Sequence, residues 1–213
     1  MSYEQLRKTL VENLNRERYI QSERVKDAFL RIPREDFLPL NQRPYAYVDT
    51  PLQIGHGQTI SAPHMVAIMC EALDLHEGQK VLEIGTGSGY HAAIIAVIVG
   101  DTGHVYTIER FAHLAKIAES NLHQANIMNV TVSIGDGSKG LPAFQPYDRI
   151  YVTAAAPAIP PPLIEELKED GKLLVPVGNV YCDLIRLEKH EGKTHSTSLG
   201  GGMFVPLVGE FGV

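Results

Sequence analysis

A glycine-rich loop follows an apolar, strand-like run in the segment VLEIGTGSGY. The run leads into Gly85, Gly87 and Gly89, and a helical segment follows. Such a loop lets a ligand approach the backbone at a helix N-terminus. Glu83 precedes the loop, and an anionic side chain there favours a cationic ligand over a pyrophosphate. Tyr90 stands where a dinucleotide fingerprint would have its third glycine. The alternative interpretation is a tight turn that glycines happen to suit.

Acidic residues also stand at the ends of two later strand-like runs. Glu109 ends HVYTIE, where an acidic side chain can accept hydrogen bonds from both ribose hydroxyls of a nucleoside, or simply favour the first turn of a helix. Asp136 and Gly137 follow the third run, where the carboxylate can meet an adenine amino group; alone, Asp-Gly is an ordinary turn signal. Parallel strands end at one sheet edge, so we expect the three groups to form one ligand site.

The elements that position these loops alternate between short apolar runs and helices. Five runs lie between residues 80 and 178, with helices expected over 89–99, 111–124 and 161–168. This alternation predicts a doubly wound, mostly parallel α/β sheet, because parallel strands need crossovers and are buried on both faces. After Val177, CDLIRLEKH and THSTSLGGGMFVPLV predict antiparallel strands at one edge.

The N-terminal part of the chain predicts a helical cap. Two amphipathic helices are followed by residues 33–60, which look irregular, and a third helix opens at Pro63. No linker separates these elements. We therefore expect a single domain over residues 1–213, with the helical part in 1–76 and the α/β core with C-terminal strands in 77–213.

Composition excludes several classes of protein. The 213 residues have a formal net charge of −6 and no basic run that could follow a phosphate backbone, so we expect no nucleic-acid partner. The longest strongly apolar stretch, 92–99, is far shorter than the ~20 residues of a membrane span. Cys70 and Cys182 have no metal-binding spacing. We expect a cytoplasmic monomer that uses neither membrane nor metal, with both cysteines reduced.

The three strand-end groups together resemble those of class I, Rossmann-like methyltransferases that use S-adenosylmethionine. A more specific likeness lies in four segments, GQTISAPHMVAIM (57–69), GDGSKG (135–140), YDRIYVTAAAP (147–157) and FVPLVGE (204–210). They resemble protein-L-isoaspartate O-methyltransferases in the same order over nearly the whole chain. The resemblance implies that S-adenosylmethionine is converted to S-adenosylhomocysteine while the free α-carboxylate of L-isoaspartyl residues, or also D-aspartyl residues, is methylated in damaged proteins. The ester then closes to a succinimide, which begins repair.

The resemblance also implies roles for individual residues. Ser61 of the TIS segment is the active-site serine. Cofactor contacts fall on Gln58, Thr59, Ser61, His64, Glu83, Gly85, Thr86, Gly87, Ser88, Glu109, Asp136 and Gly137. Substrate contacts fall on Thr59, Ile60, Ser61 and Val205. The tripeptide 205–207 helps to close the substrate cleft. His56 is a small departure, because tyrosine or another residue is frequent there in the family.

The chemistry favours Ser61 as an orienting group and not a nucleophile. If Pro63 begins a helix, Ala62 is its N-cap and the Ser61 hydroxyl is free. The alternative is a shifted register in which Ser61 caps the helix. His64 can likewise be a first-turn histidine whose hydrogen bonds are satisfied within the protein. Residues 44–79 contain neither Lys nor Arg. Methyl transfer from a sulfonium to a carboxylate neutralises both charges, so a strong ion pair to the carboxylate would favour the ground state. The carboxylate is ionised at neutral pH, so no general base is needed.

Other functions share parts of this pattern. An S-adenosylmethionine-dependent O-methyltransferase of a small-molecule carboxylate or hydroxyl shares every cofactor feature, and only TIS-x-PHM argues against it. A nucleotide-dependent oxidoreductase is disfavoured by Tyr90 and Glu83, and a non-catalytic binding module by the cofactor-site residues. Base methylation is disfavoured because TAAAP (153–157) replaces the Asn/Asp-Pro-Pro-aromatic tetrad.

Overall fold

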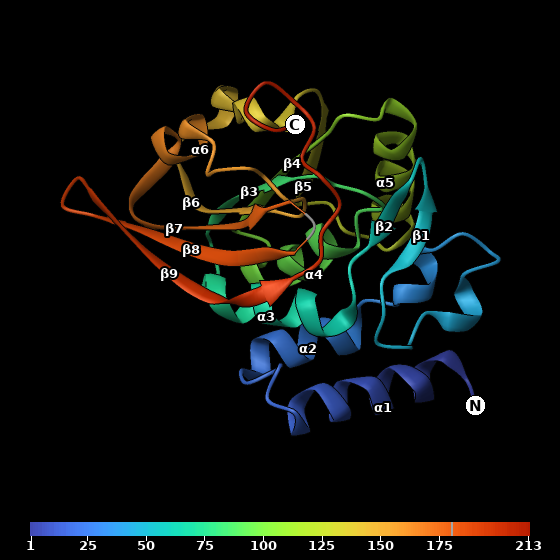
Figure 1. Ribbon diagram of the computed structural model, residues 1–213. Coiled ribbons are helices and arrows are strands. Elements are labelled where there is room, and N and C mark those ends of the chain that lie inside the picture. The colour runs from blue at the N-terminus through green and yellow to red at the C-terminus, as the bar shows by residue number, and fades with distance from the viewer. Residues whose placement is uncertain (180) are drawn as a thin grey trace.

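The centre of the fold is a seven-stranded sheet with the order β5-β4-β3-β6-β7-β8-β9. A computed structural model describes residues 1–179 and 181–213 (Figure 1). The strands are β3 (Lys80–Ile84), β4 (His104–Glu109), β5 (Val130–Ile134), β6 (Tyr147–Val152), β7 (Leu167–Gly178), β8 (Cys182–His190) and β9 (Lys193–Gly202). The five strands β5, β4, β3, β6 and β7 pair in parallel in that order. β8 pairs antiparallel with both β7 and β9. The predicted mostly parallel sheet with an antiparallel edge is confirmed, and β9 is the outer strand.

The strand order reverses at β3. From β3 the chain runs outward through β4 and β5 and then returns to the other side of β3 as β6. Loops that leave neighbouring strands in opposite directions create a crevice at the carboxyl ends of those strands. The loops after β3, β4 and β6 therefore meet at one place.

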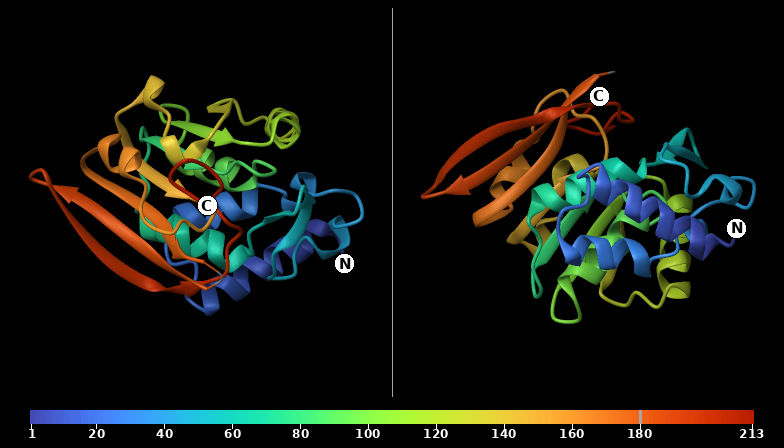
Figure 2. Two further views of the ribbon diagram at one scale, coloured as in Figure 1. Left: turned by 45° about the horizontal axis from the view of Figure 1, so that its top comes forward. Right: turned by 90° about the horizontal axis from the view of Figure 1, so that it is seen from below.

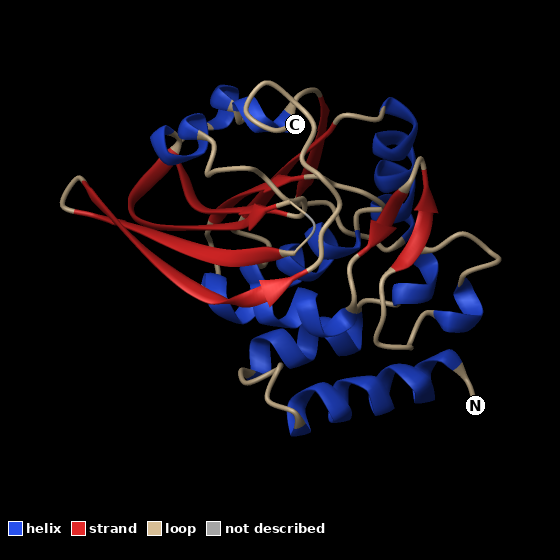
Figure 3. Ribbon diagram, viewed as in Figure 1, coloured by secondary structure: helices blue, strands red, loops and turns tan. Residues whose placement is uncertain are grey.

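Helices cover both faces of the sheet (Figure 3). They are α1 (Tyr3–Arg16), α2 (Glu23–Arg31), α3 (Pro63–Leu73), α4 (Tyr90–Val99), α5 (Ala112–Gln124) and α6 (Pro161–Glu165). The helices α3 and α4 lie on one face, and α1 and α2 form a further layer over them (Figure 2). Alternate strand residues divide between two cores: Val81 packs with these helices, while Leu82 packs with Leu163 of α6. This alternation is expected of strands buried on both faces.

Residues 33–60, predicted to be irregular, contain a β-hairpin. β1 (Leu52–Gly55) pairs antiparallel with β2 (Gln58–Ile60). Two short 3-10 helices, η1 (Arg34–Phe37) and η2 (Arg43–Tyr45), precede it. Strands of three or four residues carry little periodic signal, which explains why the sequence prediction missed this hairpin.

The C-terminal elements differ from the prediction at two boundaries. The helix expected over 161–168 ends at Glu165, because the backbone carbonyl of Glu166 accepts from the N–H of Tyr147 and draws the following residues into β7. The last strand ends at Gly202, earlier than the expected run through 208. Beyond it the chain is held by a parallel bridge between Pro206 and Ala155.

Three further features bear on the predictions. The connection from β5 to β6 contains only the 3-10 helices η3 (Gly137–Lys139) and η4 (Pro142–Phe144) among its described elements, as the missing helical signal indicated. Within the ranges that the structure describes, no helix is long and apolar enough to cross a membrane. Cys70 and Cys182 are both buried and not joined in a disulfide.

Candidate active site

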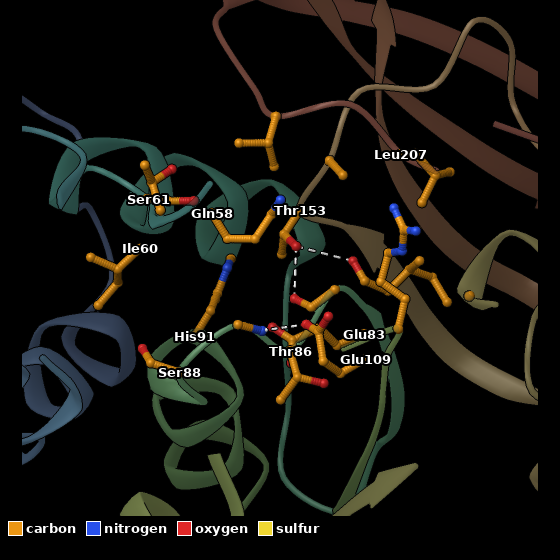
Figure 4. Close-up of a pocket in the computed structure, with 18 of the residues that line it drawn as sticks. Gln58, Ile60, Ser61, Glu83, Thr86, Ser88, His91, Glu109, Thr153 and Leu207 are labelled. Carbon is orange, nitrogen blue, oxygen red and sulfur yellow. Dashed lines mark hydrogen bonds between the residues drawn. The ribbon is translucent and has the colours of Figure 1, made fainter. Parts of the chain in front are cut away.

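A pocket opens at the carboxyl ends of β3, β4 and β6 (Figure 4). The pocket is open to solvent, and its empty volume counted out through the mouth is about 830 Å³. Most of the predicted site residues line it: Gln58, Thr59, Ile60, Ser61, Glu83, Gly85, Thr86, Gly87, Ser88, Glu109, Gly137 and Val205. Segments that are far apart in the sequence thus contribute to one cavity.

The glycine loop after β3 wraps closely around its neighbours. Gly85 has a φ of 94°, and a Cβ atom at this position would collide with Oγ1 of Thr153. The Thr153 hydroxyl donates to the carbonyl oxygens of Ile84 and Gly85, at 3.1 and 2.7 Å. The loop therefore requires a glycine at its first position, and Thr153, which sequence reasoning missed, anchors the loop to the end of β6.

Glu109 organises the other side of the loop. Its Oε2 accepts from the backbone N–H of Gly87 at 2.9 Å, and its Oε1 accepts from the N–H of Phe111 at 3.0 Å. Each carboxylate oxygen has two acceptor positions, so both oxygens can still accept from a ligand hydroxyl. The side chain is thus held in place before any ligand arrives.

Glu83 lies fully buried beneath the loop. It accepts from Oγ1 of Thr107 at 2.6 Å and from the hydroxyl of Tyr151 at 2.7 Å. Burial raises the pKa of Glu83 to about 8, although both hydrogen bonds act in the opposite direction. A cation in the pocket would favour the ionised carboxylate.

The partners of Glu83 are its neighbours in the sheet. Thr107 pairs with Glu83 in β4, and Tyr151 pairs with it in β6. Sequence reasoning missed both residues. The signal that identifies them is the strand order and register, which the sequence pattern did not supply.

The Ser61 hydroxyl does not cap α3, as predicted for a helix that begins at Pro63. α3 begins at Pro63, its N-cap is Ala62, and no side chain caps this helix end. The Ser61 hydroxyl lines the pocket and makes no hydrogen bond to any described residue. Figure 4 shows Ser61 and Gln58 on the side of the pocket opposite Glu83 and Glu109. The alternative in which Ser61 caps the helix is wrong.

Two predicted cofactor residues lie outside the pocket lining. His64 turns to Asp49, which accepts from its backbone N–H at 2.9 Å and contacts its Nδ1 at 2.9 Å. His64 is the satisfied first-turn histidine of the alternative interpretation. Asp136 accepts from the N–H of Ser138 and from the N–H of Glu210, at 3.0 and 2.9 Å. Its carboxylate thus fastens the C-terminal segment, since the chain returns to this strand end.

The pocket also holds polar atoms that have no protein partner. Oγ of Ser88 and Nδ1 of His91 are buried without a hydrogen-bond partner among residues 1–179 and 181–213. Burial lowers the pKa of His91 to about 3, so its imidazole is neutral. A buried polar atom without a partner needs an explanation, and a polar ligand in the pocket would supply one for Ser88.

The tip of the β1–β2 hairpin contacts the N-terminal end of α5. The ring of His56, at the hairpin tip, stacks on Phe111 with centroids 5.1 Å apart and lies 5.5 Å from the ring of His113. Phe111 itself lines the pocket. The hairpin therefore connects the N-terminal part of the chain to the loop that follows Glu109.

The expectation of no metal site stays a prediction. A group of side chains that could contact a cation, Glu169, Asp170 and His190, lies exposed and away from the pocket lining. There Nδ1 of His190 already pairs with Asp170 at 2.6 Å. We assign no function to this group.

Comparison with known proteins gives consistent results. The family model "Protein-L-isoaspartate(D-aspartate) O-methyltransferase" matches residues 4–212. A protein-L-isoaspartate O-methyltransferase from Hyperthermus butylicus is 54% identical over 99% of this chain and 91% of its own. A solved protein-L-isoaspartate O-methyltransferase superposes with a TM-score of 0.88, at 33% identity over 97% of this chain and 67% of that one. A Plasmodium falciparum structure of this type, in complex with S-adenosyl-L-homocysteine, has a TM-score of 0.85 at 28% identity, covering 94% of this chain and 97% of that one.

Proposed function

Because this chain belongs to the protein-L-isoaspartate(D-aspartate) O-methyltransferase family, we propose that it methylates the free α-carboxylate of L-isoaspartyl residues in proteins and peptides, with S-adenosylmethionine as donor. The observation that carries the proposal is the meeting of two motifs in one pocket. The glycine loop with Glu109 lies opposite the segment that carries Ser61.

The pocket suits the donor on three counts. The glycine loop brings backbone within reach of a ligand at the start of α4. Glu109 presents a fixed carboxylate to ribose hydroxyls, and Ser88 offers an unpartnered hydroxyl. Glu109 presents a carboxylate to the pocket, and a bound cation would favour the ionised form of Glu83 beneath it. When bound, S-adenosylmethionine supplies an electrophilic methyl group on a sulfonium.

The acceptor side of the pocket orients a carboxylate without pairing it to a charge. The Ser61 hydroxyl is available to donate one hydrogen bond to the substrate, and Thr59 and Ile60 also line the pocket. Val205 and Leu207 line the pocket, and their apolar side chains would help to exclude water from a bound substrate. A neutral donor positions the nucleophile while leaving its charge available for reaction.

The test is methyl transfer from labelled S-adenosylmethionine to two synthetic peptides that differ only in one aspartyl linkage, normal or isoaspartyl. We expect base-labile label on the isoaspartyl peptide alone. Label on neither peptide, with S-adenosylhomocysteine still bound, would contradict the substrate assignment. Label on free small carboxylic acids alone would support the alternative methyltransferase.

We extend the proposal to the setting in which the enzyme works. Residues 1–213 act as a single methyltransferase domain, since pocket residues come from both 1–76 and 77–213. The enzyme acts as a cytoplasmic monomer whose macromolecular partners are damaged proteins, not nucleic acid or membranes. The free thiols of Cys70 and Cys182 support this assignment. Light scattering after size-exclusion chromatography tests the monomer, and a dimer would contradict it.

A further inference from the structure

Arg34 is a buried cation close to the pocket that the proposed reaction has not used. It lies in η1 and is fully buried. Its Nη2 donates to the backbone carbonyl of Ser61 at 2.7 Å. Its Nε and Nη1 have no hydrogen-bond partner in the part of the chain that the structure describes, and within that part it forms no ion pair. A buried guanidinium with so few partners is costly to folding.

The surroundings of Arg34 connect both sides of the pocket. Its guanidinium carbon lies 4.9 Å from the centre of the Tyr90 ring. Tyr90 is the first residue of α4, directly after the glycine loop, and it lines the pocket. The ring also packs edge-on against Phe29 and Phe37, so its position is fixed by the core. Arg34 therefore bridges the start of α4 and the peptide that carries Ser61.

Two carboxylates in this part of the chain have other hydrogen-bond partners. The carboxylate of Asp49 is held by His64, and the carboxylate of Glu35 accepts from the hydroxyl of Tyr47. The guanidinium is thus left to the Ser61 carbonyl and the Tyr90 ring. Burial lowers the pKa of Arg34, but arginine remains protonated in proteins, so the hydrogen bond to Ser61 is charge-assisted.

We propose that Arg34 is a positioning residue for methyl transfer, which fixes the Ser61 peptide relative to Tyr90 at the start of α4 and so sets the direction of the Ser61 hydroxyl. This inference rests on the proposed function. The guanidinium contacts the backbone of Ser61 and not its hydroxyl, so the cation orients the hydrogen-bond donor without forming an ion pair with the substrate carboxylate. Small errors in the alignment of reacting groups cost large factors in rate.

The test compares Arg34→Met and Arg34→Lys in two backgrounds, the natural chain and Ser61→Ala. The readouts are kcat and KM for an isoaspartyl peptide and the Kd of S-adenosylhomocysteine. We expect Arg34→Met to lower kcat about tenfold or more, with the Kd changed less than about twofold. Arg34→Lys, which keeps the charge and an N–H donor but not the planar guanidinium, should fall between. In the Ser61→Ala background both substitutions should change kcat less than about twofold, because the group that Arg34 positions is gone.

Two controls separate positioning from a general loss of structure. Arg31→Met, at an exposed arginine three residues earlier, should leave all three constants unchanged. If Arg34→Met no longer binds S-adenosylhomocysteine, its loss of kcat reports a general loss of structure. The kcat of Arg34→Lys in the same two backgrounds then tests the inference. Equal losses of kcat with and without Ser61, or no loss at all, would overturn the inference while the proposed function stands. An inactive natural enzyme would overturn both.

Discussion

The backbone N–H of Gly87 donates to Oε2 of Glu109 across 2.9 Å, and this bond joins the loop after β3 to the end of β4. The carboxylate thereby acts twice, as a support for the glycine loop and as an acceptor facing the pocket. The cofactor site is consequently shaped before the cofactor binds, which reduces the ordering that binding requires.

Replacing Glu109 by Gln should weaken the binding of S-adenosylhomocysteine by about 10- to 100-fold, because hydrogen bonds to a charged group contribute about 1.5–3 kcal/mol. The amide keeps one acceptor oxygen but loses the charge and places an NH₂ group against a backbone donor. Titration calorimetry measures the Kd. Glu119→Gln, at an exposed position of α5, is the matched control. Equal affinity in both variants would show that Glu109 does not contact the ligand.

Ser61→Ala should lower kcat on the isoaspartyl peptide by about 10- to 100-fold, the value of one hydrogen bond to a carboxylate. The Kd of S-adenosylhomocysteine should change little, since the glycine loop and Glu109 are untouched. Steady-state kinetics and calorimetry check the two parts. Ser196→Ala, on the exposed face of β9, provides the comparison. A kcat that equals that of the natural enzyme would remove Ser61 from the mechanism.

Glu83 makes stability depend on pH. Its pKa is raised from 4.5 to about 8 in the folded protein, so between these values the folded state keeps a proton that the unfolded state has released. The free energy of unfolding therefore falls as pH rises through this window. Glu83→Gln removes the titration, and its Tm without cofactor should fall less between pH 5 and pH 8 than that of the natural chain.

Thermal unfolding at several pH values tests this expectation. Glu119→Gln again serves as the control, because its carboxylate is exposed. Parallel curves of Tm against pH for the natural chain and Glu83→Gln would show that Glu83 is ionised in both states.

His56 should help to retain the cofactor. Its stacking on Phe111 links the hairpin tip to the loop that follows Glu109. An aromatic pair contributes about 0.5–1.5 kcal/mol, so His56→Ala should speed dissociation of S-adenosylhomocysteine by roughly two- to tenfold. Stopped-flow displacement measures the rate. His195→Ala, an exposed histidine on β9, should leave it unchanged, and equal rates in both variants would contradict the role of the hairpin.

The sequence by itself determined the α/β alternation, the antiparallel edge and the strand-end residues of the pocket. These features depend on local signals: the spacing of glycines after a strand, an acid at a strand end and a proline that begins α3. Once parallel strands are inferred, their carboxyl ends must share an edge, so Gly85, Glu109 and Gly137 could be brought together without coordinates. The free hydroxyl of Ser61 followed from helix register in the same way.

Tertiary structure decided which polar groups meet across long separations. Thr107 and Tyr151 reach Glu83 only because β4 and β6 flank β3 in register. Arg34 donates a hydrogen bond to the backbone carbonyl of Ser61, which lies 27 positions later in the sequence.

The two predicted cofactor residues that lie outside the pocket lining, His64 and Asp136, depend on packing in the same way. His64 contacts the carboxylate of Asp49, and Asp136 accepts a hydrogen bond from the backbone N–H of Glu210. The fold places these distant partners beside the two side chains. Local spacing sets the direction of a strand or helix and the face on which a side chain lies. Only the packing of distant segments sets what that side chain touches.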